Sequence, residues 1–109
     1  MRTERAEGLL NTPEITNFLE GIRRETAHQK ERWGEIYDRK KSAEQWYWLI
    51  GYLASKALRA HITGDLKKAK HHTISTAAAL ANWHDFITHD QSRNGQALDP
   101  DEVLKPYYQ

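Results

Sequence analysis

The sequence predicts an all-α fold in which a first helix packs across an antiparallel helical hairpin, and in which two such chains pair into a larger bundle. Two observations predict the helices. Apolar residues recur at helical spacing in three long segments, and each segment is bounded by residues that commonly begin or end helices. A third observation argues against a sheet, because no run alternates between apolar and polar residues as a strand does.

The first predicted helix follows Thr12, a suitable N-cap residue, and begins at Pro13, which favours the first helical position. Gly34 is expected to end it. The periodic face of this helix changes along its length, from apolar residues to residues with polar tips. That face consists of Ile15, Phe18, Leu19, Ile22, Thr26, Gln29 and Trp33.

The second predicted helix runs from about Ala43 to Thr63, after Ser42 and Gln45 at the spacing of a capping box. A tight turn at Gly64 and Asp65 connects it with a third helix that runs from about residue 66 to residue 89. Because the connection is short, the two helices are expected to be antiparallel neighbours. The apolar stripe of the second helix consists of Trp46, Leu49, Ile50, Leu53, Ala57 and Ala60.

The third predicted helix carries two different stripes. One stripe is polar and includes one aromatic residue. The other stripe contains large side chains, as expected of a core. Alanines in the middle of the helix let a neighbouring backbone approach closely, but they bury little area. A single chain is therefore marginal, which favours a dimer. The polar stripe consists of His72, Ser75, Ala79, Asn82 and Phe86. The bulky stripe, which we expect to be core, consists of Thr73, Thr76, Leu80, Trp83 and Ile87.

The 109 residues fit one domain, at residues 12–89, between an N-terminal extension (1–11) and a polar tail (90–109) in which at most "PDEVLK" is helical. The 16 basic and 15 acidic residues balance, which argues against nucleic acid as a partner. The absence of cysteine excludes disulfides and cysteine-based zinc sites. The most apolar run, Trp46 to Leu58, is too short to span a bilayer, and no apolar signal core begins the chain, so we expect a cytoplasmic protein.

A ligand pocket is expected between the helices. Antiparallel packing brings the Lys56 region opposite the His72 region, because both lie about two turns from the connection. Arg32 and its neighbours on the first helix are placed to close such a pocket. Cations, hydroxyls, an amide and aromatic planes suit an anionic, planar ligand such as a nucleotide. The candidate ligand-binding residues are Gln29, Trp33, Tyr52, Lys56, Arg59, His72, Ser75 and Asn82.

A simpler interpretation stays open, in which Lys56 and Arg59 belong to a solvated face and His72 is an ordinary surface histidine. No metal site is predicted, because no two histidines are separated by one helical turn as paired metal ligands commonly are. No catalytic residue is predicted either. The serines lack a nucleophile-elbow context, and the acidic pair Asp99 and Asp101 lies in the tail.

Three segments together resemble a known family. They are "IRRETAHQKERWGE", "WYWLIGYLASKALRAHITGD" and "HHTISTAAALANWHDFI", and they extend over about residues 22–87. In their order and spacing they resemble the small all-α MazG-like nucleoside triphosphate pyrophosphohydrolases, especially a branch carried by bacteriophages and prophages. Gln29 followed by Trp33 and Gly34, and the Gly-Asp turn after the next helix, match the pattern of that family.

The resemblance implies a magnesium-dependent hydrolase, but the acidic motifs that hold the metal in that family are missing here. The positions that match its Glu-Glu-x-x-Glu and Glu-x-x-Asp motifs are Gly51, Tyr52, Ser55, His72 and Ser75. The segment from Trp46 to Ile62 contains no Asp or Glu, so the conclusion holds in any register. Magnesium requires oxygen ligands. We therefore expect no cofactor and no catalysis, with Lys56 as a substitute for the charge of the metal.

The expected function is a non-catalytic nucleotide-binding protein of phage or prophage origin, which sequesters a nucleotide or a nucleotide-derived signal, or responds to one, in a bacterial host. An interaction protein that blocks a host factor through its aromatic surface at Trp46, Tyr47 and Trp48 is the alternative. A second alternative is a divergent pyrophosphohydrolase that uses His72 as a base or a ligand.

Overall fold

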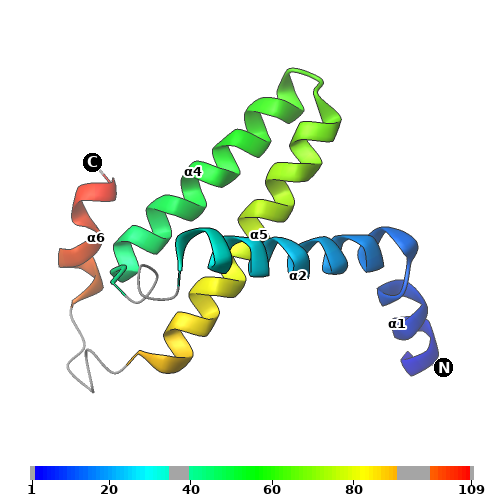
Figure 1. Ribbon diagram of the computed structural model, residues 1–109. Helices are drawn as coiled ribbons and strands as arrows, with labels where there is room; N and C mark the ends of the chain where they lie inside the picture. Colours follow the sequence, from blue (N-terminus) through cyan, green and yellow to red (C-terminus); the bar gives the residue numbers. More distant parts are fainter. Residues whose placement is uncertain (1, 35–39, 91–98, 109) are drawn as a thin grey trace.

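The computed structural model describes residues 2–34, 40–90 and 99–108. Within these ranges the chain contains helices and no strand, which confirms the all-α prediction (Figure 1). Residues 35–39, and residues 91–98 of the expected polar tail, lie outside the described residues. No helix in the described ranges is long and apolar enough to cross a membrane. The helices are α1 (Arg2–Leu10), α2 (Pro13–Trp33), α4 (Ala43–Ile62), α5 (Leu66–His89) and α6 (Pro100–Tyr108).

The ends of α2 and α4 follow the predicted capping residues. The hydroxyl oxygen of Thr12 accepts a hydrogen bond from the Ile15 N–H at 3.3 Å, and Gly34 ends α2 with a φ of 80°. Ser42 and Gln45 form the predicted capping box, with bonds of 2.8 and 3.2 Å. These bonds satisfy backbone groups that have no partner within the helix. The predicted starts of both helices are therefore confirmed.

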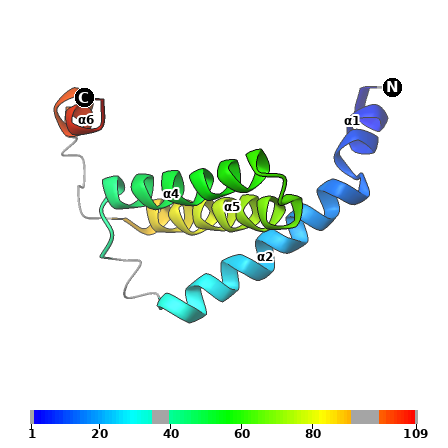
Figure 2. The same cartoon turned by 90° about the horizontal axis from the view of Figure 1, so that it is seen from above.

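The α4–α5 pair forms the predicted antiparallel hairpin (Figures 1 and 2). Gly64 has a φ of 86°, which side chains disfavour, and the Asp65 side chain accepts a hydrogen bond from the Lys68 N–H at 3.2 Å. At the far end of the hairpin, Trp46 is 1% exposed and its ring centroid lies 5.9 Å from that of Phe86. The predicted stripe of α4 is confirmed, since all six of its residues are buried or half-buried.

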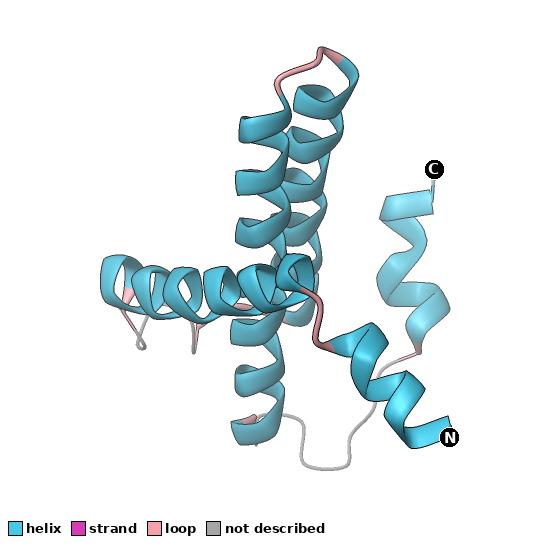
Figure 3. Ribbon diagram, turned by 90° about the vertical axis from the view of Figure 1, so that its right-hand side faces the viewer, coloured by secondary structure: helices cyan, strands magenta, loops and turns pink. Residues whose placement is uncertain are grey.

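The central helix is α5, with α4 along one side and α2 across another (Figures 2 and 3). The α2 backbone approaches closely, because a Cβ added at Gly21 would lie 2.9 Å from Cδ1 of Ile74. Farther along, the Lys30 ammonium donates to the Asp85 carboxylate over 3.1 Å, and this hydrogen bond lowers the pKa of Asp85. The pair is partly exposed, so it adds at most about 1 kcal/mol to the free energy of unfolding.

The face of α5 that packs is not the one expected from bulk, but the stripe one residue away from it. The buried or half-buried residues of the polar stripe are His72, Ser75, Ala79, Asn82 and Phe86. In the bulky stripe, half-buried residues are Thr76 and Trp83, and exposed residues are Thr73, Leu80 and Ile87. The expectation that the bulky stripe forms the core is therefore wrong. Small side chains let α2 and α4 pack close to the α5 backbone, whereas larger side chains on that face would hold the helices apart.

Both ends of the chain are more helical than expected. The segment predicted as an N-terminal extension contains α1. The last helix, α6, has nine residues and continues through Pro106, where at most two turns were expected. Its start is capped locally, because the Asp99 carboxylate accepts a hydrogen bond from the Asp101 N–H at 3.0 Å. Figure 3 shows α1 and α6 away from the crossing of α2 and α5.

Candidate ligand pocket between three helices

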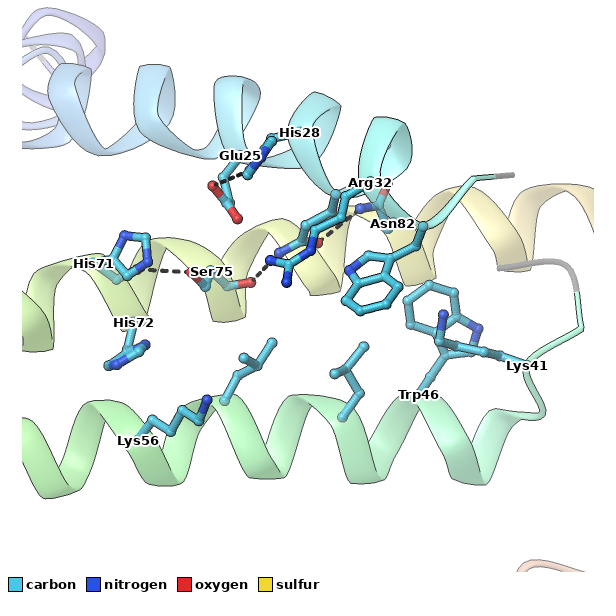
Figure 4. A pocket seen from close by; sticks show the side chains of 14 residues that line it. Glu25, His28, Arg32, Lys41, Trp46, Lys56, His71, His72, Ser75 and Asn82 are labelled. Carbon is cyan, nitrogen blue, oxygen red and sulfur yellow. Dashed lines mark hydrogen bonds and ion pairs between the residues drawn. The ribbon is translucent and has the colours of Figure 1, made fainter. Parts of the chain in front are cut away.

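A pocket with a volume of about 460 Å³ lies where α2 passes over the α4–α5 hairpin (Figure 4). Residues of α2 form one side of the pocket, residues of α5 form its back wall, and residues of α4 form the opposite side. The fold thus gathers side chains that are distant in the sequence, such as Gln29 and Asn82, which lie 53 positions apart. The predicted candidates that line the pocket are Gln29, Trp33, Lys56, His72, Ser75 and Asn82.

Two candidates, Tyr52 and Arg59, are not among the residues that line the pocket. Tyr52 is half-exposed and holds the Lys56 ammonium 4.5 Å from its ring centroid, and Arg59 is exposed one turn beyond Lys56. The reason is helical geometry. Successive residues point about 100° apart, so Leu49 and Leu53 face the pocket while Tyr52 turns away.

Several lining residues were not among the candidates. Glu25 precedes Gln29 by one helical turn, so the position of Gln29 was a signal that could have found it. Arg32, which was expected to close the pocket, does line it. Lys41 lies in the connection before α4, where periodicity carries no information. The remaining lining residues are His28, Trp46, Leu49, Leu53 and His71.

Gln29 clamps α2 to α5 through both ends of its amide. Its Nε2 donates to the backbone carbonyl of Ser75 over 3.1 Å, and its Oε1 accepts from Nδ2 of Asn82 over 3.0 Å. A carbonyl only accepts hydrogen bonds, so the Ser75 carbonyl requires the amide nitrogen of Gln29 to face it. With its nitrogen facing Ser75, Gln29 presents its amide oxygen to Asn82, so Asn82 must present its amide nitrogen in return. One backbone carbonyl therefore orients two side-chain amides, and Gln29 has a structural role beside any contact with a ligand.

Two buried polar atoms near the pocket have no hydrogen-bond partner among the described residues. They are Nε1 of Trp46 and Oδ1 of Asn82. Both residues line the pocket, but both are almost completely buried, with 1% and 4% of their surface exposed. A ligand in the pocket therefore meets other groups first.

The accessible lining is cationic. Arg32, Lys41 and Lys56 contribute three positive charges, whereas Glu25 is the one acid among the described lining residues. That carboxylate lies 3.5 Å from Nδ1 of His28. The guanidinium of Arg32 also sits 4.9 Å from the ring centroid of the neighbouring tryptophan. The pocket thus combines positive charge with an aromatic plane and attracts an anion.

Burial lowers the pKa of His72 below its usual value of 6.5, and the nearby charges of His71, Lys56 and Lys68 lower it further. Asp65 acts in the opposite direction. The rings of His71 and His72 are 5.4 Å apart between centroids. The lowered pKa favours the neutral ring, which offers a hydrogen-bonding nitrogen without a charge.

The positions that match the acidic motifs of the resembled family do not fit magnesium. Gly51, Tyr52 and Ser55 do not line the pocket, and the Ser55 hydroxyl donates to the Tyr52 carbonyl at 2.7 Å. The Ser75 hydroxyl likewise donates to the carbonyl of His71 at 3.2 Å. Across the described residues, no group of three or more His, Asp or Glu side chains is placed to hold a metal ion.

No protein-family profile, no curated protein and no solved structure matches this chain.

Proposed function

We propose that the protein binds a nucleotide, or a nucleotide-derived signal, in the pocket between α2, α4 and α5 and does not hydrolyse it. The observation that carries the proposal is the lining of a 460 Å³ space with three cations, three histidines and an exposed tryptophan, opposed by one acid. A volume of this order suits a small organic ligand. The charges suit phosphate, and the aromatic plane suits a base.

The positions of the side chains suggest how the ligand lies. Lys56, His71 and His72 stand at one end of the pocket, and Lys41 stands at the other (Figure 4). In our proposal the phosphate group contacts Lys56 and accepts a hydrogen bond from His72. The base stacks on Trp33, which is 53% exposed. Arg32 lies between the two ends and contacts the sugar or a second phosphate.

The resemblance to MazG-like pyrophosphohydrolases supports the same ligand class. A register one residue later than the first match places the acidic motif on Tyr52, Leu53 and Lys56, and two of these positions line the pocket. Lys56 then stands where that family holds its metal. A lysine neutralises phosphate, but it does not lower the pKa of a water molecule as a metal ion does. We therefore propose binding rather than hydrolysis, by a phage-type protein in a bacterial host.

Isothermal titration calorimetry against mono-, di-, tri- and cyclic nucleotides tests the proposal. We expect heat of binding for at least one nucleotide, and no product by chromatography after incubation with Mg²⁺, Mn²⁺ or Zn²⁺. The absence of binding by every nucleotide, with the helices intact by circular dichroism, contradicts the proposal. Turnover of a triphosphate would instead favour the divergent pyrophosphohydrolase, in which His72 acts in the reaction.

An interaction protein directed at a host factor is the second candidate, because large aromatic side chains remain exposed. Tyr47 and Trp48 on α4 are 48% and 60% exposed. Capture of one bacterial protein by the wild-type chain, and its loss in a Trp48→Ser variant, would support this candidate.

A further inference from the structure

The one acid among the described lining residues of the pocket is Glu25 on α2. Contacts on either side of it fix its place. One turn earlier on α2, Gly21 lies against Ile74 of α5, and one turn later Gln29 donates to the Ser75 carbonyl. Glu25 therefore lies over the same part of α5, on the side of α2 that faces the pocket.

Glu25 stands at the end of the pocket where the phosphate is placed. Figure 4 shows its carboxylate on the α2 side of that end, across from His71 and His72 on α5 and Lys56 on α4. The side chain of Glu25 is 23% exposed, so solvent screens its charge less than that of a surface acid. Its ion-pair partner is His28, which carries a charge only when it is protonated. The negative charge of Glu25 therefore acts on a ligand at this end.

The side chains at this end can hold one phosphate but offer little to a longer chain. Lys56 contributes one positive charge, and Glu25 contributes one negative charge that offsets it. The hydroxyl of Ser75 already donates to the carbonyl of His71. The ammonium and a histidine ring nitrogen suffice for one phosphate, whereas each further phosphate adds negative charge without a further cation at this end.

The backbone of the described residues adds no free N–H group to this end. Proteins that bind phosphate chains often use free N–H groups at the start of a helix. Only the first four N–H groups of a helix lack a partner within it. The lining residues at this end, such as His71 and Lys56, lie beyond the first turns of α5 and α4, so their N–H groups are bonded within the helices.

We infer that the pocket binds nucleotides with a single phosphate more tightly than those with a phosphate chain, and that Glu25 determines this preference. The inference rests on the proposed function, because it concerns the ligand of the same pocket. The phosphate, as a monoester or a cyclic diester, contacts Lys56 and His72, and Arg32 contacts the sugar. A longer chain brings more negative charge toward the Glu25 carboxylate, and like charges repel.

Magnesium would reverse the role of Glu25. A carboxylate can bind a magnesium ion that is already held by the phosphates of a nucleotide, and Glu25 would then favour the longer chain. The two roles predict opposite results when the charge of Glu25 is removed. A test must therefore compare nucleotides both with and without Mg²⁺.

Calorimetry at low salt with AMP, cyclic AMP, ADP and ATP, and with the same guanosine series, tests the inference in EDTA and in Mg²⁺. In EDTA the affinity of the wild-type chain should fall about threefold or more from the monophosphate to the triphosphate. Glu25→Gln keeps the size of the side chain and removes its charge. It should raise the affinity for the triphosphate by about tenfold and change that for the monophosphate by less than about threefold.

Glu31→Gln is the matched control, because Glu31 is an exposed acid of α2 that does not line the pocket. It should leave every affinity unchanged, and circular dichroism checks that both variants are helical. The nucleotide series with the wild-type chain tests the same preference without any substitution.

The outcomes separate this inference from the proposed function. If no nucleotide binds, both are wrong. If the triphosphate binds as tightly as the monophosphate in EDTA, the proposed function stands and the preference for a single phosphate is wrong. Triphosphate binding that requires Mg²⁺ and is lost in Glu25→Gln would show that Glu25 binds magnesium, which also overturns the inference. Tightest binding of either AMP or cyclic AMP, or of either guanosine counterpart, supports the inference and identifies the form of the phosphate.

Discussion

Asn82 on α5 donates a hydrogen bond of 3.0 Å to the amide oxygen of Gln29 on α2, and this contact joins the pocket to the core. Gln29→Leu should lower the free energy of unfolding by about 1–3 kcal/mol, because it leaves the Asn82 amide buried without that partner. Asn82→Leu should have a similar cost. The double variant should cost less than the sum of the two, because the partners are lost together.

Urea unfolding of the three variants measures these differences. Arg24→Ala is the control, since it removes an ion pair with Glu20 at an exposed site, and it should change stability by less than about 0.5 kcal/mol. Strictly additive effects of the two leucine substitutions would show that the amides do not act as one unit.

Lys56 and Arg59 form a matched pair for testing the pocket. Both are cations on α4, but only Lys56 lines the pocket. Lys56→Gln should weaken nucleotide binding by about tenfold or more, because a hydrogen bond to a charged group contributes about 1.5–3 kcal/mol. Arg59→Gln should change it less than about twofold. Calorimetry with the best-binding nucleotide measures both, and equal losses would place the ligand elsewhere.

The lowered pKa of His72 predicts how stability depends on pH. Between that lowered pKa and the usual value of 6.5, the unfolded chain binds more protons at this residue than the folded chain. The contribution of His72 to stability is therefore complete above pH 6.5, and it falls as the pH falls through the window. An anionic ligand should raise the pKa of His72, because negative charge favours the protonated ring.

Unfolding free energies at several pH values, with an NMR titration of the His72 ring, check this prediction. His72→Gln should remove part of the pH dependence, whereas Thr73→Gln at the exposed neighbouring position should leave it intact. A ring that titrates at or above the usual value in the free protein would contradict it.

Trp46 and Trp33 should respond differently to the same substitution. Trp46 is 1% exposed, so Trp46→Ala should cost about 3–5 kcal/mol. Trp33 is half-exposed at the end of α2, and Trp33→Ala should cost less than about 1 kcal/mol. The effects on nucleotide binding should have the opposite order. Trp33→Ala should weaken binding more than a Trp46 variant that remains folded, such as Trp46→Phe. Thermal unfolding and calorimetry on the same samples separate the two effects.

The boundaries of α2, α4 and α5 could be predicted because their causes are local. Thr12, Ser42 and Gly64 act within one turn of the chain, so their neighbours in sequence suffice. The packed face of α5 could not be predicted, because periodicity defines stripes without telling which stripe a neighbouring helix takes. The large side chains of the stripe with Leu80 led us to expect it in the core. The stripe with Ser75 packs instead, because its small side chains let the neighbouring helices approach closely.

The candidate site could be predicted in part, because periodicity places some of its residues on the stripes that pack. Residues such as His72 and Gln29 lie on packed stripes, and the hairpin brings those stripes together. Tyr52 lies one residue from a packed stripe, and one residue on a helix is enough to change its side. Lys41 enters from a connection, where only the fold determines its position.

The crossing of α2 over the hairpin also has a kinetic consequence. The hairpin closes through a short turn, whereas α2 is held by distant contacts such as Gln29 with Asn82 and Lys30 with Asp85. We therefore expect α2 to open more readily than α4 or α5, so that its backbone amides exchange hydrogen faster. Since α2 forms one side of the pocket, a bound nucleotide should slow exchange most in α2. Uniform exchange across the three helices, or slowing confined to the hairpin, would contradict this. Exchange that begins in α2 would instead show that one side of the pocket moves to admit the ligand.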